Sequence, residues 1–263
     1  NYVNINNYRQ YKNDMIDETE NKRMIIQEKK TGKFYLAQIN PNEKMNTQEE
    51  FEKKKKLDEI ISIFDHPSIL KYFVFSSINY DKLPHPVLIN EYLEISLYDV
   101  LKSANDLKEW NMTKKLINIY GIADGMKYLH SNGILHRNLT ASSILEDENY
   151  HPKITNFHNI QQCKDFSKNN DGHLINSKYV SPEVVEDYKY SKSSDVFSFA
   201  IILYEIITNE IPFSEFQNDL DIRKAIWEGY RPEFNKHIPQ CYQNLIELCW
   251  SDDPSKRPTF HEI

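Results

Sequence analysis

The sequence predicts an α+β fold whose larger, C-terminal part is mainly helical. Two apolar patterns indicate the helices. Apolar residues recur at helical spacing from 116 to 129, which predicts an amphipathic helix. Residues 196–207 are apolar on nearly every face, which predicts a helix buried inside a core. The chain has 263 residues, 40% of them hydrophobic, and this suits one unit with a large core.

One helix is predicted in the N-terminal part, over residues 47–64. Ile60, Ile61 and Phe64 give it an apolar stripe, and an Asp-His-Pro sequence directly after Phe64 ends it. Residues 53–56 are consecutive lysines, which we interpret as a solvated helix face. A binding site for an anionic partner is the alternative.

The two C-terminal helices carry signals at their ends. Gly133 is expected to help terminate the first helix, because glycine readily adopts the left-handed backbone found there. Ser193 or Ser194 is expected to cap the start of the second. On the first helix we expect Tyr120 and Met126 to lie in the core, together with the aliphatic residues at the same spacing.

Composition argues against several classes of protein. The net charge of −7 argues against a nucleic-acid surface, which needs a basic stripe. Three scattered cysteines provide neither a disulfide framework nor metal-ligand spacing, so we expect a reducing, cytoplasmic location. No apolar run approaches the length of a membrane span, and no signal peptide opens the chain.

The most specific pattern lies at residues 135–145, which read Leu-His-Arg-Asn-Leu-Thr-Ala-Ser-Ser-Ile-Leu. It resembles the catalytic loop of protein kinases, which reads His-Arg-Asp, four residues, then Asn and two apolar residues. In a kinase, the Asp accepts the proton of the substrate hydroxyl and the Asn holds magnesium. Asn138 and Ser143 stand at these positions, so the loop resembles the kinase scaffold without its active groups.

Four further motifs follow in the family's order. Residues 153–158 resemble a strand that enters the Asp-Phe-Gly motif, with Asn156 at the metal-binding Asp. Residues 179–183 resemble the Ala-Pro-Glu motif, and residues 194–200 resemble the start of the long central helix. Residues 249–260 are similar to the ending of tyrosine and tyrosine-kinase-like kinases. The chain is therefore identified as a member of the protein kinase superfamily, in the tyrosine-kinase-like group, with the degenerate motifs of a pseudokinase.

This resemblance implies a bilobal protein-kinase-like fold, with a small, mainly β N-lobe containing one main helix and a larger, mainly α C-lobe. We expect a single domain over residues 1–263, with the N-lobe and hinge at 1–93 and the C-lobe at 94–263.

The resemblance also implies contacts that maintain the fold. Asp195 would accept hydrogen bonds from the backbone of the catalytic loop. Glu183 would pair with Arg257, and His136 and Phe157 would pack as buried side chains.

In the N-lobe, the residues that hold phosphate in kinases are replaced. Residues 15–23 stand where a Gly-rich loop is expected, yet the first glycine of the chain is Gly32. Residues 31–39 resemble a turn and the third strand. One register places Gln38 at the phosphate-binding Lys, and a shift of one residue places Ile39 there.

The helix Glu that pairs with this Lys in kinases aligns with Leu57. Asp58 and Glu59 lie close by, so the equivalent position stays open.

Residues 87–93 resemble the fifth strand and the hinge, whose backbone groups could still receive an adenine. Asn90 stands at the gatekeeper position. The resemblance implies a vestigial nucleotide pocket formed by Gln38, Asn90, Glu91, Tyr92, Leu93 and Leu145.

The replaced residues predict the function. Phosphoryl transfer depends on positioning and on charge neutralisation, and the base, two magnesium ligands, the phosphate-binding Lys and the glycines are replaced together. We therefore expect no enzyme, no catalytic residue, no metal site and no cofactor. The expected function is that of a scaffold or allosteric regulator that binds a protein partner, such as an active kinase or another domain of the same chain. A nucleotide-binding switch that takes ATP without metal or turnover, and a weak residual protein kinase, are the alternatives.

Overall fold

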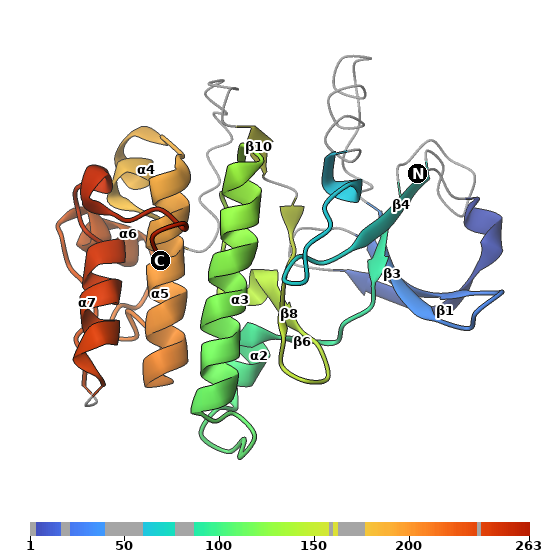
Figure 1. Cartoon of the computed structure of the whole chain (residues 1–263), viewed down its shortest axis with the longest axis horizontal. Helices are drawn as coiled ribbons and strands as arrows, with labels where there is room; N and C mark the ends of the chain where they lie inside the picture. Colours follow the sequence, from blue (N-terminus) through green and yellow to red (C-terminus); the bar gives the residue numbers. More distant parts are fainter. Residues whose placement is uncertain are drawn as a thin grey trace. The chain divides into compact units, whose positions relative to one another are not determined.

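The computed structural model describes residues 4–16, 22–39, 60–76, 87–157, 160–162, 177–235 and 238–263. These residues belong to two compact units, Asn1–Leu93 and Glu94–Ile263 (Figure 1). The first unit is built on an antiparallel sheet, and the second is mainly helical.

In the described part of the N-terminal unit, five strands form a sheet of order β1-β2-β3-β5-β4, with every neighbouring pair antiparallel. The strands, preceded by a short 3-10 turn η1 at Ile5–Asn7, are β1 Tyr8–Ile16, β2 Lys22–Glu28, β3 Phe34–Ile39, β4 Tyr72–Ser76 and β5 Val87–Glu91.

The predicted turn before β3 is confirmed. Gly32 has a φ of +73°, which is costly for residues with a Cβ, and its amide donates to the Glu28 carbonyl at 2.9 Å. The Glu28 amide in turn donates to the Lys33 carbonyl at 2.9 Å. This turn brings β2 and β3 into register.

One face of the sheet carries the core of this unit. Ala37 and Ile89 are cross-strand partners, and both are fully buried. The ring of Tyr8 meets the ring of Tyr35 edge-on, with 5.8 Å between their centroids. Because successive side chains point to opposite faces of a strand, those of Leu36, Gln38 and Asn90 point away from this core.

Most of the predicted N-terminal helix lies outside the described residues. Residues 47–59 are not described, and they include Leu57, Asp58, Glu59 and the run of lysines. Residues 60–62 are helical, and Ile61 and Phe64 are buried, as the apolar stripe predicts.

The C-terminal unit contains short strands and longer helices. Its helices are α2 Leu97–Lys102, α3 Met112–Ser131, α4 Pro182–Asp187, α5 Lys192–Thr208, α6 Asp219–Trp227 and α7 Gln240–Cys249, with 3-10 turns η2 Ala141–Ser143, η4 Ser177–Tyr179 and η5 Pro254–Lys256. Its strands are β6 Ile95–Ser96, β7 Ile134–Leu135, β8 Ile144–Glu146, β9 Pro152–Ile154 and β10 Gln161–Gln162. Strand β8 lies between β6 and β9, and β7 pairs with β10.

Helix α5 is the centre of this unit, where it contacts both α3 and α7 (Figure 1). Most of its residues are buried, as its apolar sequence predicts. The predicted N-cap, Ser193 or Ser194, is wrong by two or three residues. Ser191 caps the helix by accepting a hydrogen bond from the Ser194 amide, because the helix begins at Lys192.

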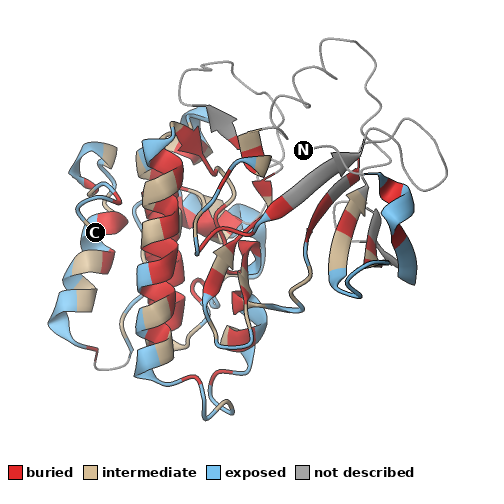
Figure 2. Ribbon diagram, turned by 45° about the vertical axis from the view of Figure 1, so that its right-hand side comes forward, coloured by how far each residue is buried: buried red, intermediate tan, exposed pale blue. Residues whose placement is uncertain are grey.

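Helix α3 is amphipathic, and Met126 is fully buried as predicted. The chain leaves the helix through Gly133 at a φ of +73°, which confirms the predicted termination. The prediction for Leu116 and Tyr120 is wrong, because these side chains are 43% and 73% exposed. They lie one turn apart and outside the buried stripe of the helix. Figure 2 colours the chain by burial and shows buried and exposed residues side by side along the helices.

Among the described residues, none of the helices combines the length and the hydropathy that crossing a membrane requires.

Candidate functional site

Asp195, in the first turn of α5, holds the loop that follows β7. Its Oδ1 accepts a hydrogen bond from the Arg137 amide at 2.9 Å, and its Oδ2 accepts one from the His136 amide at 2.9 Å. His130, on α3, approaches the same Oδ2 with its Nε2 at 2.9 Å. The predicted contact between Asp195 and the loop backbone is confirmed.

The charges at this junction follow from burial and from these bonds. Burial alone would raise the pKa of Asp195, but the hydrogen bonds from the His130 side chain and from the His136 amide outweigh it and hold the pKa below its ordinary value. Burial lowers the pKa of His136. A neutral His136 therefore donates from Nε2 to the Thr155 carbonyl at 2.9 Å and accepts from the Asn138 amide at 3.3 Å.

Two residues of the predicted site have left-handed backbones. Arg137 has a φ of +64° and Asn156 a φ of +65°. Asn tolerates this region better than most residues, because its short amide bonds locally. Phe157 follows Asn156 and packs edge-on against His136, with 5.6 Å between ring centroids. The predicted packing of His136 and Phe157 is confirmed.

The hydroxyl of Ser143 faces its own loop. Its Oγ donates to the Thr140 carbonyl at 2.8 Å and accepts from the Thr140 amide at 2.8 Å. The Ser143 amide donates to Thr140 Oγ1 at 3.1 Å, so the two residues cap η2 reciprocally. Thr155, the neighbour of Asn156, donates its amide to the Ser143 carbonyl at 2.9 Å. The segments that carry Ser143 and Asn156 therefore lie side by side.

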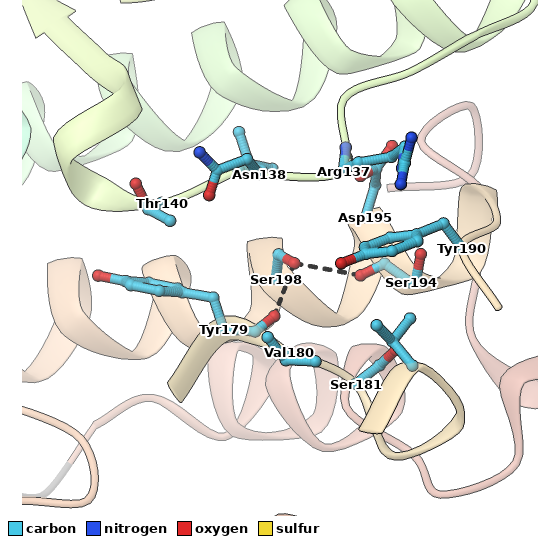
Figure 3. A pocket seen from close by; sticks show the side chains of 12 residues that line it. Arg137, Asn138, Thr140, Tyr179, Val180, Ser181, Tyr190, Ser194, Asp195 and Ser198 are labelled. Carbon is cyan, nitrogen blue, oxygen red and sulfur yellow. Dashed lines mark hydrogen bonds between the residues drawn. The ribbon is translucent and has the colours of Figure 1, made fainter. Parts of the chain in front are cut away.

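Asn138 lines a pocket between the loop, the segment from Tyr179 to Val184 and the first turns of α5 (Figure 3). The pocket is small, with a cavity volume of about 20 Å³. Arg137 lies at one side, with its guanidinium 4.4 Å from the centroid of the Tyr190 ring. Nε of Arg137 is buried and has no hydrogen-bond partner among the described residues. The pocket is thus open and has a cation at its wall.

The opposite wall of the pocket is tied to α5. The Tyr179 hydroxyl donates to Glu205 at 2.8 Å, and Lys178 Nζ lies 2.9 Å from the same carboxylate. Burial raises the pKa of Glu205, against the effect of Lys178. Glu183 and Arg257 form a bidentate pair at 2.7 and 2.9 Å, which confirms the predicted pairing.

In the N-terminal unit, Gln38 and Asn90 lie on one face of the sheet. Asn90 is opposite Leu36, and Gln38 is opposite Leu88, in the pairing of β3 with β5. Gln38 Oε1 and Asn90 Oδ1 are buried without a hydrogen-bond partner among the described residues. The side-chain Nδ2 of Asn90 donates to the Glu91 backbone carbonyl at 2.8 Å. This face of the sheet therefore carries two hydrogen-bond acceptors without partners among the described residues.

The remaining predicted pocket residues belong to different units. Glu91 ends β5, and Tyr92 and Leu93 follow it at the end of the first unit. Leu145 lies on β8 in the second unit. Residues 17–21, in the stretch that stands where a Gly-rich loop is expected, lie outside the described residues.

Two residues of the pocket were not predicted from the sequence. Tyr190 stacks on Arg137, and Ser181 lines the pocket with a buried hydroxyl that has no partner among the described residues. The sequence holds no signal for the Tyr190 contact. The serine in the Val-Ser-Pro-Glu stretch, where the resembling motif has Ala, is the sign that could have identified Ser181.

The chain is similar to kinases of several organisms. It is 34% identical over 239 residues to dual specificity protein kinase pyk3 of Dictyostelium discoideum, covering 88% of this chain and 16% of that protein. It is 35% identical over 189 residues to serine/threonine-protein kinase 12 of Arabidopsis thaliana, covering 67% of this chain and 39% of that protein. The chain thus spans well under half the length of either relative.

These names correct one prediction. The relatives are serine/threonine or dual-specificity protein kinases, so they are enzymes, and nothing in the comparisons marks this chain as inactive. The prediction that the chain is no enzyme is therefore wrong. It rested on the replaced residues Asn138, Ser143, Asn156 and Gln38 and on the missing Gly-rich loop, and these do not outweigh the kinase relatives.

The family comparison agrees with the relatives and with the fold. The model of the family described as protein tyrosine and serine/threonine kinase matches residues 20–263, nearly the whole chain. Its β-sheet N-lobe and helical C-lobe correspond to the two units, and the predicted bilobal α+β fold is confirmed. The chain belongs to the protein tyrosine and serine/threonine kinase family.

Proposed function

We propose that this kinase-family chain acts in signalling mainly as a scaffold or allosteric regulator that binds a protein partner, and that its phosphoryl transfer is slow. The observation that carries the proposal is the contrast within one loop. The Asp195 network supports the loop backbone, whereas Asn138 and Ser143 replace the groups that act on substrate and metal in the resembling motif. The loop therefore keeps the contacts that support its backbone, but the side chains that carry out rapid phosphoryl transfer in the resembling motif are replaced.

The donors at this site do not fit a magnesium ion. Magnesium is usually held by carboxylates and waters in near-ideal octahedral geometry. Asn138 and Asn156 are neutral amides, and the hydroxyl of Ser143 is engaged with Thr140. We therefore propose no metal site and no required cofactor.

The ending at residues 249–260 supports a place in the tyrosine-kinase-like group, with the degenerate motifs of a pseudokinase. The proposed partner is an active kinase or another domain of the same protein. The scattered cysteines support a cytoplasmic location, and the acidic net charge argues against a nucleic-acid partner.

A second candidate is a nucleotide switch that binds ATP without metal. The shared sheet face of Gln38 and Asn90 favours it, because both side chains have a buried oxygen without a partner among the described residues. Such acceptors suit a ligand with amino donors, and adenine carries one.

Single-turnover phosphoryl transfer tests the proposal. The purified chain is mixed with radiolabelled ATP and a generic basic protein substrate in magnesium or manganese. We expect a rate far below the roughly 1–100 s⁻¹ of ordinary kinases. Asn138→Asp should change it by less than about tenfold, although a general base is commonly worth about 10²–10⁴. A rate in the ordinary range that Asn138→Ala abolishes would refute the proposal.

A further inference from the structure

The turn between β2 and β3 carries a group of exposed positive charges. Residues 27–34 read Gln-Glu-Lys-Lys-Thr-Gly-Lys-Phe, and the exposed side chains among them include all three lysines, Lys29, Lys30 and Lys33. The stretch has one carboxylate, Glu28, which accepts a hydrogen bond from Thr31 Oγ1. The turn is therefore positively charged, although the whole chain has a net charge of −7.

Hydrogen bonds hold this turn against the neighbouring strand β1 and the segment that precedes it. Gln27 Nε2 donates to the Gly32 carbonyl at 2.7 Å, and Gln27 Oε1 accepts from Arg9 Nε on β1 at 2.9 Å. Lys29 Nζ donates to the Asn6 carbonyl at 2.8 Å. Arg9 is exposed, so these bonds fix a fourth cation beside the three lysines.

Two exposed aromatic side chains lie beside these cations. Phe34, at the start of β3, is 40% exposed, and Tyr11, on β1, is 64% exposed. Their rings meet edge-on, with 4.8 Å between centroids. Gln27 is the cross-strand partner of both Arg9 and Phe34, which places these two side chains in one row on the same face of the sheet. The ring pair leaves apolar area in water that a partner would bury.

We infer that this end of the sheet binds the surface of an anionic lipid bilayer through a basic tip formed by Arg9, Tyr11, Lys29, Lys30, Lys33 and Phe34. Negatively charged headgroups attract the cations. Aromatic rings are favoured at the level of the headgroups, and the long apolar stems of the lysines let their ammonium groups reach the same layer. The tip thus combines the two kinds of side chain that a bilayer interface takes up together.

The spread of the cations favours a broad surface over a single anionic side chain. Arg9 lies on β1 and Lys33 directly precedes β3, so these residues are two strands apart, which corresponds to about 10 Å. A bilayer presents negative headgroups across such a span. The net negative charge of the chain opposes contact elsewhere, so an anionic surface should meet the chain at the tip. The cytoplasmic leaflet carries anionic lipids, which agrees with the cytoplasmic location proposed above.

Vesicle sedimentation tests the inference. The purified chain is mixed with phosphatidylcholine vesicles that either contain or lack phosphatidylserine, and the bound fraction is measured as lipid is increased. We expect binding to be at least about tenfold tighter with phosphatidylserine and to be lost as salt is raised. The probe is lipid alone, so the result does not depend on the proposed binding of a protein partner.

Substitutions assign the binding to the tip. Lys30→Gln and Lys33→Gln should each weaken binding to phosphatidylserine vesicles about fivefold, and the double variant about twenty-fivefold. Lys108→Gln combined with Lys189→Gln removes the same charge from exposed positions of the C-terminal unit and should change binding less than about twofold. Thermal unfolding of each variant shows whether it is folded.

A second variant reports where the bilayer is touched. Phe34→Trp places a fluorescent ring on the tip, and bromine-labelled lipids should quench its emission beyond the quenching seen with the native chain. Phe34→Ser should weaken binding severalfold while leaving its salt dependence unchanged, because it removes apolar contact and no charge.

Three results would overturn the inference. The first is equal binding to vesicles with and without phosphatidylserine, and the second is equal loss of binding in the folded tip and control double variants. The third is tighter binding of the tip to a polyglutamate peptide or to a single-stranded oligonucleotide than to the vesicles. That result would assign the surface to an acidic protein or to a nucleic acid instead.

Discussion

Asn118 and Glu146 meet inside the C-terminal unit with only part of their hydrogen-bonding capacity used. Asn118 Nδ2 lies 3.4 Å from Glu146 Oε2, while Asn118 Oδ1 and Glu146 Oε1 are buried without partners among the described residues. Burial raises the pKa of Glu146 to about 8, against the hydrogen bond from Asn118. A protonated Glu146 gains a hydrogen-bond donor, and Asn118 Oδ1 is an acceptor without a partner among the described residues, so the neutral acid fits this junction better than the carboxylate.

The first prediction is that Glu146 makes the folded chain less stable as pH rises. Its pKa is higher in the folded chain than the ordinary value of 4.5, so unfolding releases a proton between these values. The stabilisation is complete below about pH 4.5 and is lost as pH rises through about 8. The slope approaches about 1.4 kcal/mol per pH unit within this window.

Glu146→Gln should remove this slope, because the amide keeps the shape and does not titrate. Urea unfolding at pH 5.5, 6.5 and 7.5 measures the difference between the variant and the native chain. Exposed Glu148→Gln serves as the matched control and should run parallel to the native chain. If the unfolding free energies of Glu146→Gln and of the native chain changed with pH in the same way, Glu146 would be ionised in the folded chain throughout this range.

The second prediction concerns the ion pair of Glu183 and Arg257. The Arg257 side chain is 0% exposed and that of Glu183 is 18% exposed. Glu183→Gln leaves a buried guanidinium without its counter-charge, which should cost about 3 kcal/mol of unfolding free energy. Glu228→Gln is the control, since its contact with Lys224 is 3.9 Å long and exposed, and such pairs contribute about 1 kcal/mol or less. Equal losses in the two variants by chemical denaturation would contradict this ranking.

The third prediction is that magnesium adds nothing to nucleotide binding. Thermal unfolding is measured without nucleotide and with millimolar ATP, first in magnesium and then in EDTA. The curves with ATP should coincide in the two conditions, because the replaced site has no carboxylate for the metal at Asn138, Ser143 or Asn156. Any stabilisation by ATP should decrease in Gln38→Leu. A shift that requires magnesium would mean that other residues hold the ion.

The sequence by itself determined the fold and the positions of the loop residues. Spacing along the chain placed Asn138, Ser143 and Asn156 relative to one another, and the pairs Asp195 with the loop and Glu183 with Arg257 formed as predicted. The two pairings were implied by the resemblance to protein kinases, whereas the helices followed from helical periodicity, which is a local property of a sequence. The kinase relatives overturned the one inference that rested on replaced residues alone.

The tertiary structure decided which side chains have hydrogen-bond partners among the described residues and which do not. The hydroxyl of Ser143 is engaged with Thr140, whereas that of Ser181 is buried and unpartnered among the described residues. Tyr120 is exposed although it follows the helical period, because a stripe has an edge that only the packing of neighbouring elements defines. The stacking of Tyr190 on Arg137 joins segments far apart in the chain, and no local pattern encodes such a contact.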